Sequence, residues 1–150
     1  MKSNVLIHLG AEDWMHAAWR GRFYPDDLPD EWLLSYYNTQ FKTVFLSSRK
    51  GGAAGTQDWS NWLSDTLEDF VFIVENSDGL QVPSSDRILV ASPDWLVRHV
   101  YWLDDAPDLR ALARRIAEHA ATGVSLFVIS REGGLDALQR AQTLREVMGY

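Results

Sequence analysis

Residues 109–129, LRALARRIAEHAATGVSLFVI, contain the pattern on which the predicted fold rests. Apolar side chains recur every three or four positions from Leu109 to Ala120, with charged side chains between them, which predicts an amphipathic helix. Gly123 stands where a helix C-cap belongs. The continuous apolar run Leu126–Ile129 is typical of a strand that is covered on both faces. The segment therefore predicts a helix that leads into a buried strand.

The rest of the chain repeats this alternation of helical segments and apolar runs. Four further runs predict buried strands, at Val5–Leu9, Thr43–Leu46, Phe70–Val74 and Ile88–Ala91. Apolar residues with helical spacing lie between the first and second runs, between the second and third runs, and again near the C-terminus. Strands that alternate with helices indicate right-handed crossovers and a parallel sheet.

One segment admits two interpretations. Ser92-Pro93-Asp94 is a good helix start, whereas Val97–Trp102 fits a strand equally well. A helix is the favoured prediction for residues 92–103. A strand there would give the sheet six strands instead of five.

The predicted fold is a single α/β domain over residues 1–150, with a mostly parallel sheet of five or six strands and flanking helices. Two arrangements fit this pattern, an open flavodoxin-like sheet and half of a TIM barrel, because a complete barrel needs ~250 residues and eight strands. The open sheet is favoured. Either arrangement leaves sheet edges unpaired, so a homodimer or another protein partner is expected.

Composition excludes several classes of function. The net charge of −7 argues against nonspecific nucleic-acid binding, which needs clustered Lys and Arg. The absence of cysteine excludes disulfides and thiolate metal sites. No apolar run approaches the ~20 residues that span a membrane, and the N-terminal run is too short for a secretory signal. We therefore expect a cytoplasmic protein that binds neither nucleic acid nor membrane.

An aromatic motif lies between the first predicted strand and the first helix. Trp14 is followed by WRGRFYP at residues 19–25, and Tyr36-Tyr37, Phe41 and Thr43-Val44 come further on. This pattern resembles the opening of the YecE-like family of bacterial TIM barrels, a domain of unknown function numbered seventy-two. The family motif W-x-G-x-F-Y-P is matched by Trp19, Gly21, Phe23, Tyr24 and Pro25. The resemblance covers residues 5–75 and is confined to the N-terminal half of the chain.

Three positions depart from the family pattern at predicted strand ends and in the first loop. Phe45 replaces a glutamate, Glu75 replaces a lysine, and Asp13 replaces a glycine. TIM barrels keep their chemistry at the C-terminal ends of the strands. The resemblance therefore implies a shortened bacterial relative whose family activity is altered or absent. The predicted function is a noncatalytic binding or interaction module.

The alternative is a small enzyme that acts on a phosphorylated or carboxylated metabolite at the C-terminal edge of the sheet. Glycine-rich stretches at 49–55 and 131–134 follow two strands there and would present backbone N–H groups and cationic side chains to an anion. His8, placed near the end of the first strand, and Glu75 are the candidate acid and base. The candidate ligand-binding residues are Asp13, Trp14, Trp19, Tyr24, Arg49, Lys50, Arg131 and Gly133. No metal or cofactor is expected, because neither metal-ligand spacing nor a nucleotide fingerprint is present.

Overall fold

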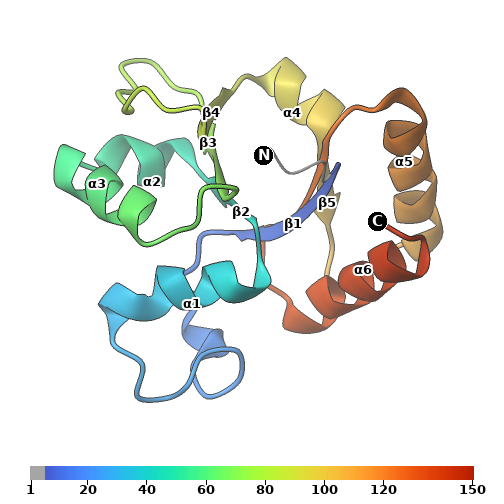
Figure 1. Cartoon of the computed structure of the whole chain (residues 1–150), viewed down its shortest axis with the longest axis horizontal. Coiled ribbons are helices and arrows are strands. Elements are labelled where there is room, and N and C mark those ends of the chain that lie inside the picture. Colours follow the sequence, from blue (N-terminus) through green and yellow to red (C-terminus); the bar gives the residue numbers. More distant parts are fainter. Residues whose placement is uncertain (1–5) are drawn as a thin grey trace.

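Six strands form one parallel sheet in the computed structural model, which describes residues 6–150 (Figure 1). The strands are β1 (Ile7–Glu12), β2 (Thr43–Leu46), β3 (Val71–Glu75), β4 (Ile88–Ala91), β5 (Val100–Leu103) and β6 (Leu126–Ser130). Their order is β4-β3-β2-β1-β6-β5. The helices are α1 (Leu33–Gln40), α2 (Ser48–Ala53), α3 (Thr56–Ser64), α4 (Pro93–His99), α5 (Leu109–Thr122) and α6 (Leu135–Val147), with short 3-10 turns η1 (Ala17–Trp19) and η2 (Asp30–Trp32).

The predicted parallel α/β fold is confirmed, and the sheet is curled into a half-barrel. The favoured flavodoxin-like order is not the one observed. The first four strands follow one another across the sheet as in a barrel, and β6 returns to the free side of β1. Val5, the first residue of the predicted first strand, lies outside the described residues.

The two faces of the curled sheet bury different sets of side chains. Ile7, Leu9 and Ala11 of β1 face outward into the larger core beneath the helices. The inner face is filled by a smaller cluster that includes Phe45, Ile73, Ala91, Val100, Phe127 and Ile129. Side chains of α4 pack against this inner cluster, and α4 spans from β4 to β5 in Figure 1. Helix α4 therefore covers the opening between the edge strands β4 and β5. The expected homodimer stays a prediction.

The ambiguous segment 92–103 contains both predicted elements in succession. Ser92 caps α4, because its Oγ accepts a hydrogen bond from Trp95 N (3.2 Å). The chain then continues directly into β5, which pairs with β6. The prediction of a helix throughout was wrong at Val100–Leu103, where a four-residue run is long enough for an edge strand.

The glycine-rich stretch 49–55 was predicted as a loop after the second strand, and this was wrong because most of it is helical. Ser47 caps α2 by accepting a hydrogen bond from Lys50 N (3.3 Å). In α5, by contrast, the apolar stripe and the C-cap at Gly123 are confirmed. The second glycine-rich stretch, at 131–134, is a loop that leads into α6, as predicted.

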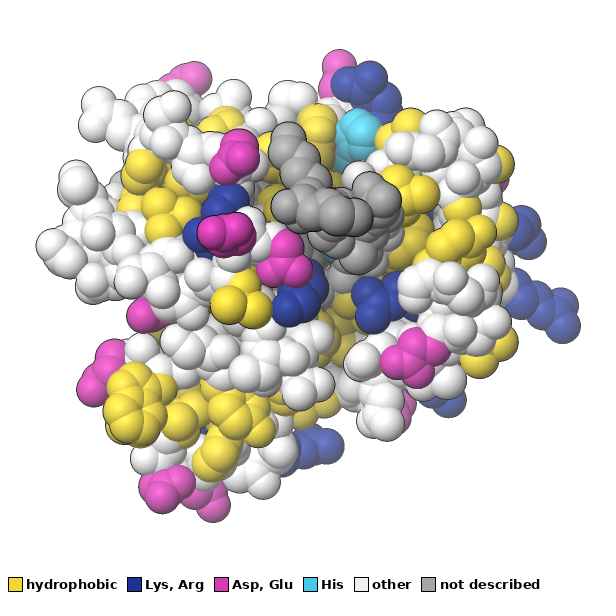
Figure 2. Space-filling view, viewed as in Figure 1, with side chains coloured by type: hydrophobic (Ala, Val, Ile, Leu, Met, Phe, Trp, Pro, Cys, Tyr) yellow, Lys and Arg dark blue, Asp and Glu magenta, His cyan; other side chains and the backbone are white. Residues whose placement is uncertain are grey.

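The described residues contain no helix that is both long enough and apolar enough to cross a membrane. On the face of the molecule in Figure 2, basic side chains are scattered among acidic and hydrophobic ones. This face therefore lacks the basic patch that a nucleic-acid backbone requires.

Strands β1 and β2 approach each other closely at Gly10. A Cβ atom at this position would lie 2.0 Å from the carbonyl oxygen of Thr43. The buried hydroxyl of Tyr37 joins the same two strands, because it donates to Thr43 O (2.6 Å) and accepts from Ala11 N (2.8 Å). The centre of the sheet thus depends on a residue without a side chain.

We predict that Gly10→Ala lowers the free energy of unfolding by about 3 kcal/mol, because the added methyl group forces β1 and β2 apart. Gly52→Ala is the matched control, since Gly52 lies in α2 with open space around it. It should raise stability by about 0.5–1 kcal/mol. Urea unfolding of both variants checks this, and equal effects would contradict the close approach.

Candidate functional site

Three charged side chains lie on the inner face of the sheet, at or just beyond the C-terminal ends of strands. Side chains alternate along a strand, so Glu12 lies on the face opposite Ile7, Leu9 and Ala11. By the same alternation Glu75 follows the inward Ile73 on β3, and Arg131 follows Ile129 after β6. We call Glu12, Glu75, Arg131 and their neighbours Trp102 and His16 the C-terminal mouth of the sheet.

Arg131 is held in place by an aromatic ring. Its guanidinium carbon lies 3.9 Å from the centroid of the Trp102 ring, and that ring meets Phe45 edge to face at 5.1 Å. Among residues 6–150, Arg131 makes neither a hydrogen bond nor an ion pair. A planar cation is therefore oriented at the mouth with its N–H donors available.

Glu12 occupies an electrostatically mixed position. Burial is the largest influence and raises the pKa of its carboxyl group, and the carboxylates of Glu75 and Asp13 raise this pKa further. Arg131 and His16 act in the opposite direction. Four charged groups from three separate parts of the chain thus lie close enough to Glu12 to act on its carboxyl group.

The loop after β6 is fastened to the loop after β1. Trp19 Nε1 donates to the carbonyl oxygen of Gly133 (2.7 Å), and Ser130 Oγ accepts from the Gly133 and Gly134 amides at 3.0 and 3.2 Å. Gly133 has a φ of 71°, and a Cβ there would lie 2.8 Å from the ring of His16. His16 Nε2 is 2.7 Å from Glu12 O and must carry the hydrogen, because a carbonyl oxygen only accepts.

The predicted aromatic residues support this loop from within. Trp14, Trp19 and Tyr24 are all buried. The Tyr24 hydroxyl donates to Trp14 O (2.7 Å), and burial raises its pKa, so it keeps its proton. Trp14 also lines a cavity. Burial of Trp19 and Tyr24 leaves them as supports for the loop that carries His16.

Asp13 and Lys50 form a pair beside the mouth. Asp13 adopts a φ of 63°, and its Oδ1 accepts from the amides of Trp14 (2.7 Å) and Met15 (3.2 Å). Its other oxygen lies 3.6 Å from Lys50 Nζ. The ammonium group of Lys50 is therefore directed toward Asp13 and the ring of Trp14 rather than toward Arg131.

His8 lies elsewhere than predicted. It is the second residue of β1, not a residue near its C-terminal end, and its ring stacks on Phe127 with centroids 4.6 Å apart. The strand register places it six positions below Glu75, or about 20 Å along the strands. The structure therefore does not bring His8 and Glu75 together. The prediction placed His8 near the strand end because the predicted first strand stops three residues before the observed one. Arg49 is exposed on α2.

Three residues of the mouth were missed by the sequence analysis. Continuing the alternation of β1 through Ala11 would have placed Glu12 inside the sheet. Trp102 was missed because its segment was predicted as a helix. His16 carries no recognisable sequence signal. In the described part of the chain, no group of three His, Asp or Glu side chains is arranged to hold a metal ion.

We predict that Glu12→Gln raises the midpoint of urea unfolding at pH 7, because glutamine avoids the cost of burying a carboxylate. That cost develops as the pH rises from the ordinary pKa of glutamate through the raised pKa of the folded state. The advantage of the variant should therefore vanish at pH 3, where both states hold the proton. The control is Glu118→Gln, because Glu118 is exposed on α5, and its unfolding midpoint should change little at either pH. A Glu12→Gln protein that is less stable than the wild type at pH 7 would refute the raised pKa of Glu12.

Comparisons with known proteins agree with this architecture. The model of DUF72, a family of proteins of unknown function, matches residues 8–80. A crystal structure of a DUF72 family protein from Thermotoga maritima superposes with a TM-score of 0.63 at 12% identity, over 97% of this chain and 100% of that chain. None of the curated proteins matches the sequence significantly. The chain is therefore similar to the DUF72 family in sequence over residues 8–80, and to a DUF72 family protein in fold over nearly its whole length.

Proposed function

We propose that the protein is a noncatalytic binding module that holds the anionic group of a small metabolite at the C-terminal mouth of the sheet. The observation that carries this proposal is the environment of the Arg131 guanidinium group. Its guanidinium group is oriented by Trp102, yet it has no polar partner among the described residues. Planar guanidinium groups bind carboxylates and phosphates through two parallel hydrogen bonds.

The chemistry of the other strand ends supports binding rather than reaction. Beneath the strand ends, the inner face of the sheet carries the buried apolar residues Phe45, Ala91 and Ile129. Ligands of parallel sheets bind outside the C-terminal ends of the strands. A ligand there would meet one cation and two carboxylates against an otherwise apolar floor, which suits recognition of a small polar molecule.

The second candidate is the small enzyme with an anionic substrate, and the carboxylates favour it. Glu12 and Glu75 are the last residues of β1 and β3, and both face the inside of the sheet. Burial raises the pKa of the Glu12 carboxyl group toward the range of a general acid. Glu75 Oε1 accepts a hydrogen bond from Ser48 N (2.9 Å), which holds this carboxyl group at the end of β3. Two carboxyl groups in unlike surroundings are the arrangement that acid–base chemistry uses.

We predict that inorganic phosphate or succinate binds the wild type and that Arg131→Ala weakens this binding about tenfold, since a charge-assisted hydrogen-bonding group is lost. Isothermal titration calorimetry measures the effect. Arg140→Ala, which removes an exposed arginine of α6, is the matched control and should bind as the wild type does. If both variants bound equally, the anion site would be refuted.

A second experiment distinguishes the two functions. Phosphorylated and carboxylated metabolites are incubated with the wild type and with glutamate variants, and the metabolites are then examined by mass spectrometry. Binding without conversion supports the noncatalytic module. Conversion that is lost in Glu12→Gln and Glu75→Gln, but retained in Glu118→Gln, establishes the enzyme in its place.

A further inference from the structure

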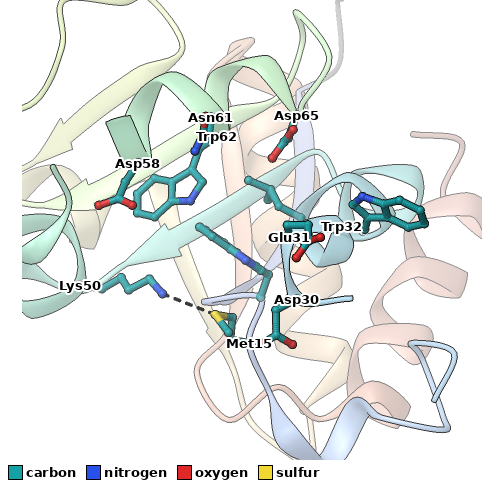
Figure 3. Close-up of a pocket in the computed structure, with 11 residues that line it drawn as sticks. Met15, Asp30, Glu31, Trp32, Lys50, Asp58, Asn61, Trp62 and Asp65 are labelled. Carbon is teal, nitrogen blue, oxygen red and sulfur yellow. Dashed lines mark hydrogen bonds between the residues drawn. The ribbon is translucent and has the colours of Figure 1, made fainter. Parts of the chain in front are cut away.

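A cavity of about 660 Å³ lies outside the sheet and separate from the Arg131 guanidinium. It is bounded by residues of α3 on one side and of η2 on the other, with Lys50 at one end (Figure 3). Three tryptophans line it: Trp14, Trp32 and Trp62. Its volume falls within the ~300–1,000 Å³ that is usual for small-molecule sites. We call this cavity the tryptophan groove.

The groove already holds an ammonium group of the protein itself. Lys50 Nζ lies 5.0 Å from the centroid of the Trp14 ring and 5.9 Å from that of Trp62. These two rings meet edge to face, with centroids 5.0 Å apart. An ammonium group within about 6 Å of an indole face is attracted by the negative charge above the ring. The aromatic wall is thus arranged as a receptor for a cation.

Charge around the groove favours a cation beyond Lys50. Four carboxylates line it, those of Asp30, Glu31, Asp58 and Asp65, against the single ammonium group of Lys50. The groove therefore has an excess of three negative charges. Two of the carboxylates have partners, because Asp30 pairs with Arg20 and Asp58 accepts from Gly55 N (2.8 Å).

The two remaining carboxylates and one indole are available to a ligand. Within residues 6–150, the side chains of Glu31 and Asp65 make no hydrogen bond or ion pair. Trp32 is 59% exposed and contacts no other aromatic ring of the described chain. A cationic ligand that covered Trp32 would remove apolar surface from water and neutralise the excess charge together.

We infer that the tryptophan groove binds a small organic ammonium compound. Its cationic head lies against the tryptophans beside Glu31 and Asp65, and it competes with the ammonium group of Lys50 for the same aromatic faces. Lys50 therefore acts as an internal occupant of this groove. This assignment is independent of the anion site at the mouth and assigns Lys50 the opposite role from an anion-binding residue.

Choline and its neutral isostere 3,3-dimethylbutan-1-ol test this inference in the full-length protein by calorimetry and tryptophan fluorescence. Choline should bind and the neutral alcohol should bind far more weakly. Trp32→Ala should weaken choline binding about three- to tenfold, whereas Tyr150→Ala, which removes another exposed aromatic ring, should not. Because Trp32 lies on the surface, its replacement leaves the core intact.

Lys50→Ala gives the most discriminating result. Removal of the competing ammonium group should tighten choline binding about threefold or more. Weaker binding in this variant would overturn the inference, because it would make Lys50 a ligand-binding group. Absence of choline binding, equal binding of the neutral alcohol, or an equal loss in Tyr150→Ala would overturn it as well.

Discussion

The pairing of β6 with β1 is the interaction on which the rest of the structure depends. The register runs from Ile7 opposite Leu126 to Ala11 opposite Ser130, so the last strand lies along all of the first except Glu12. This pairing between distant segments returns the chain to the free edge of β1. It also places Arg131 one residue beyond the partner of Ala11, and therefore beside Glu12.

The mouth that results combines groups whose proximity costs folding free energy. Glu12 is partly buried near two other carboxylates, and Arg131 stands without a polar partner in the described chain. Such arrangements persist where function maintains them, because apolar residues would stabilise the same positions better. The surrounding loop shows where rigidity comes from, since Trp19, Gly133 and Ser130 hold the two strand-end loops together.

The elements of the fold follow largely from local sequence, whereas their arrangement does not. Apolar runs identified β2 and β4 with their observed bounds, and the α5 stripe was found because its pattern is continuous. The strand order depends on nonlocal pairing, so the half-barrel could not be chosen over an open sheet. At the site, Glu75 was predicted from its place at the end of the third strand, and Arg131 from the glycine-rich stretch that follows the last strand. Glu12 was missed because Gly10 and Ala11 lack the bulk that marks a strand.

The location of a bound anion is the most direct test of this account. Amide resonances of ¹⁵N-labelled protein would be followed by NMR during titration with inorganic phosphate. If Arg131 binds anions, the largest shifts will occur at Glu12, Glu75 and residues 131–134, where three strands end at the C-terminal mouth. Shifts gathered at another surface, or an unchanged spectrum at saturating phosphate, would show that Arg131 does not organise a binding site there.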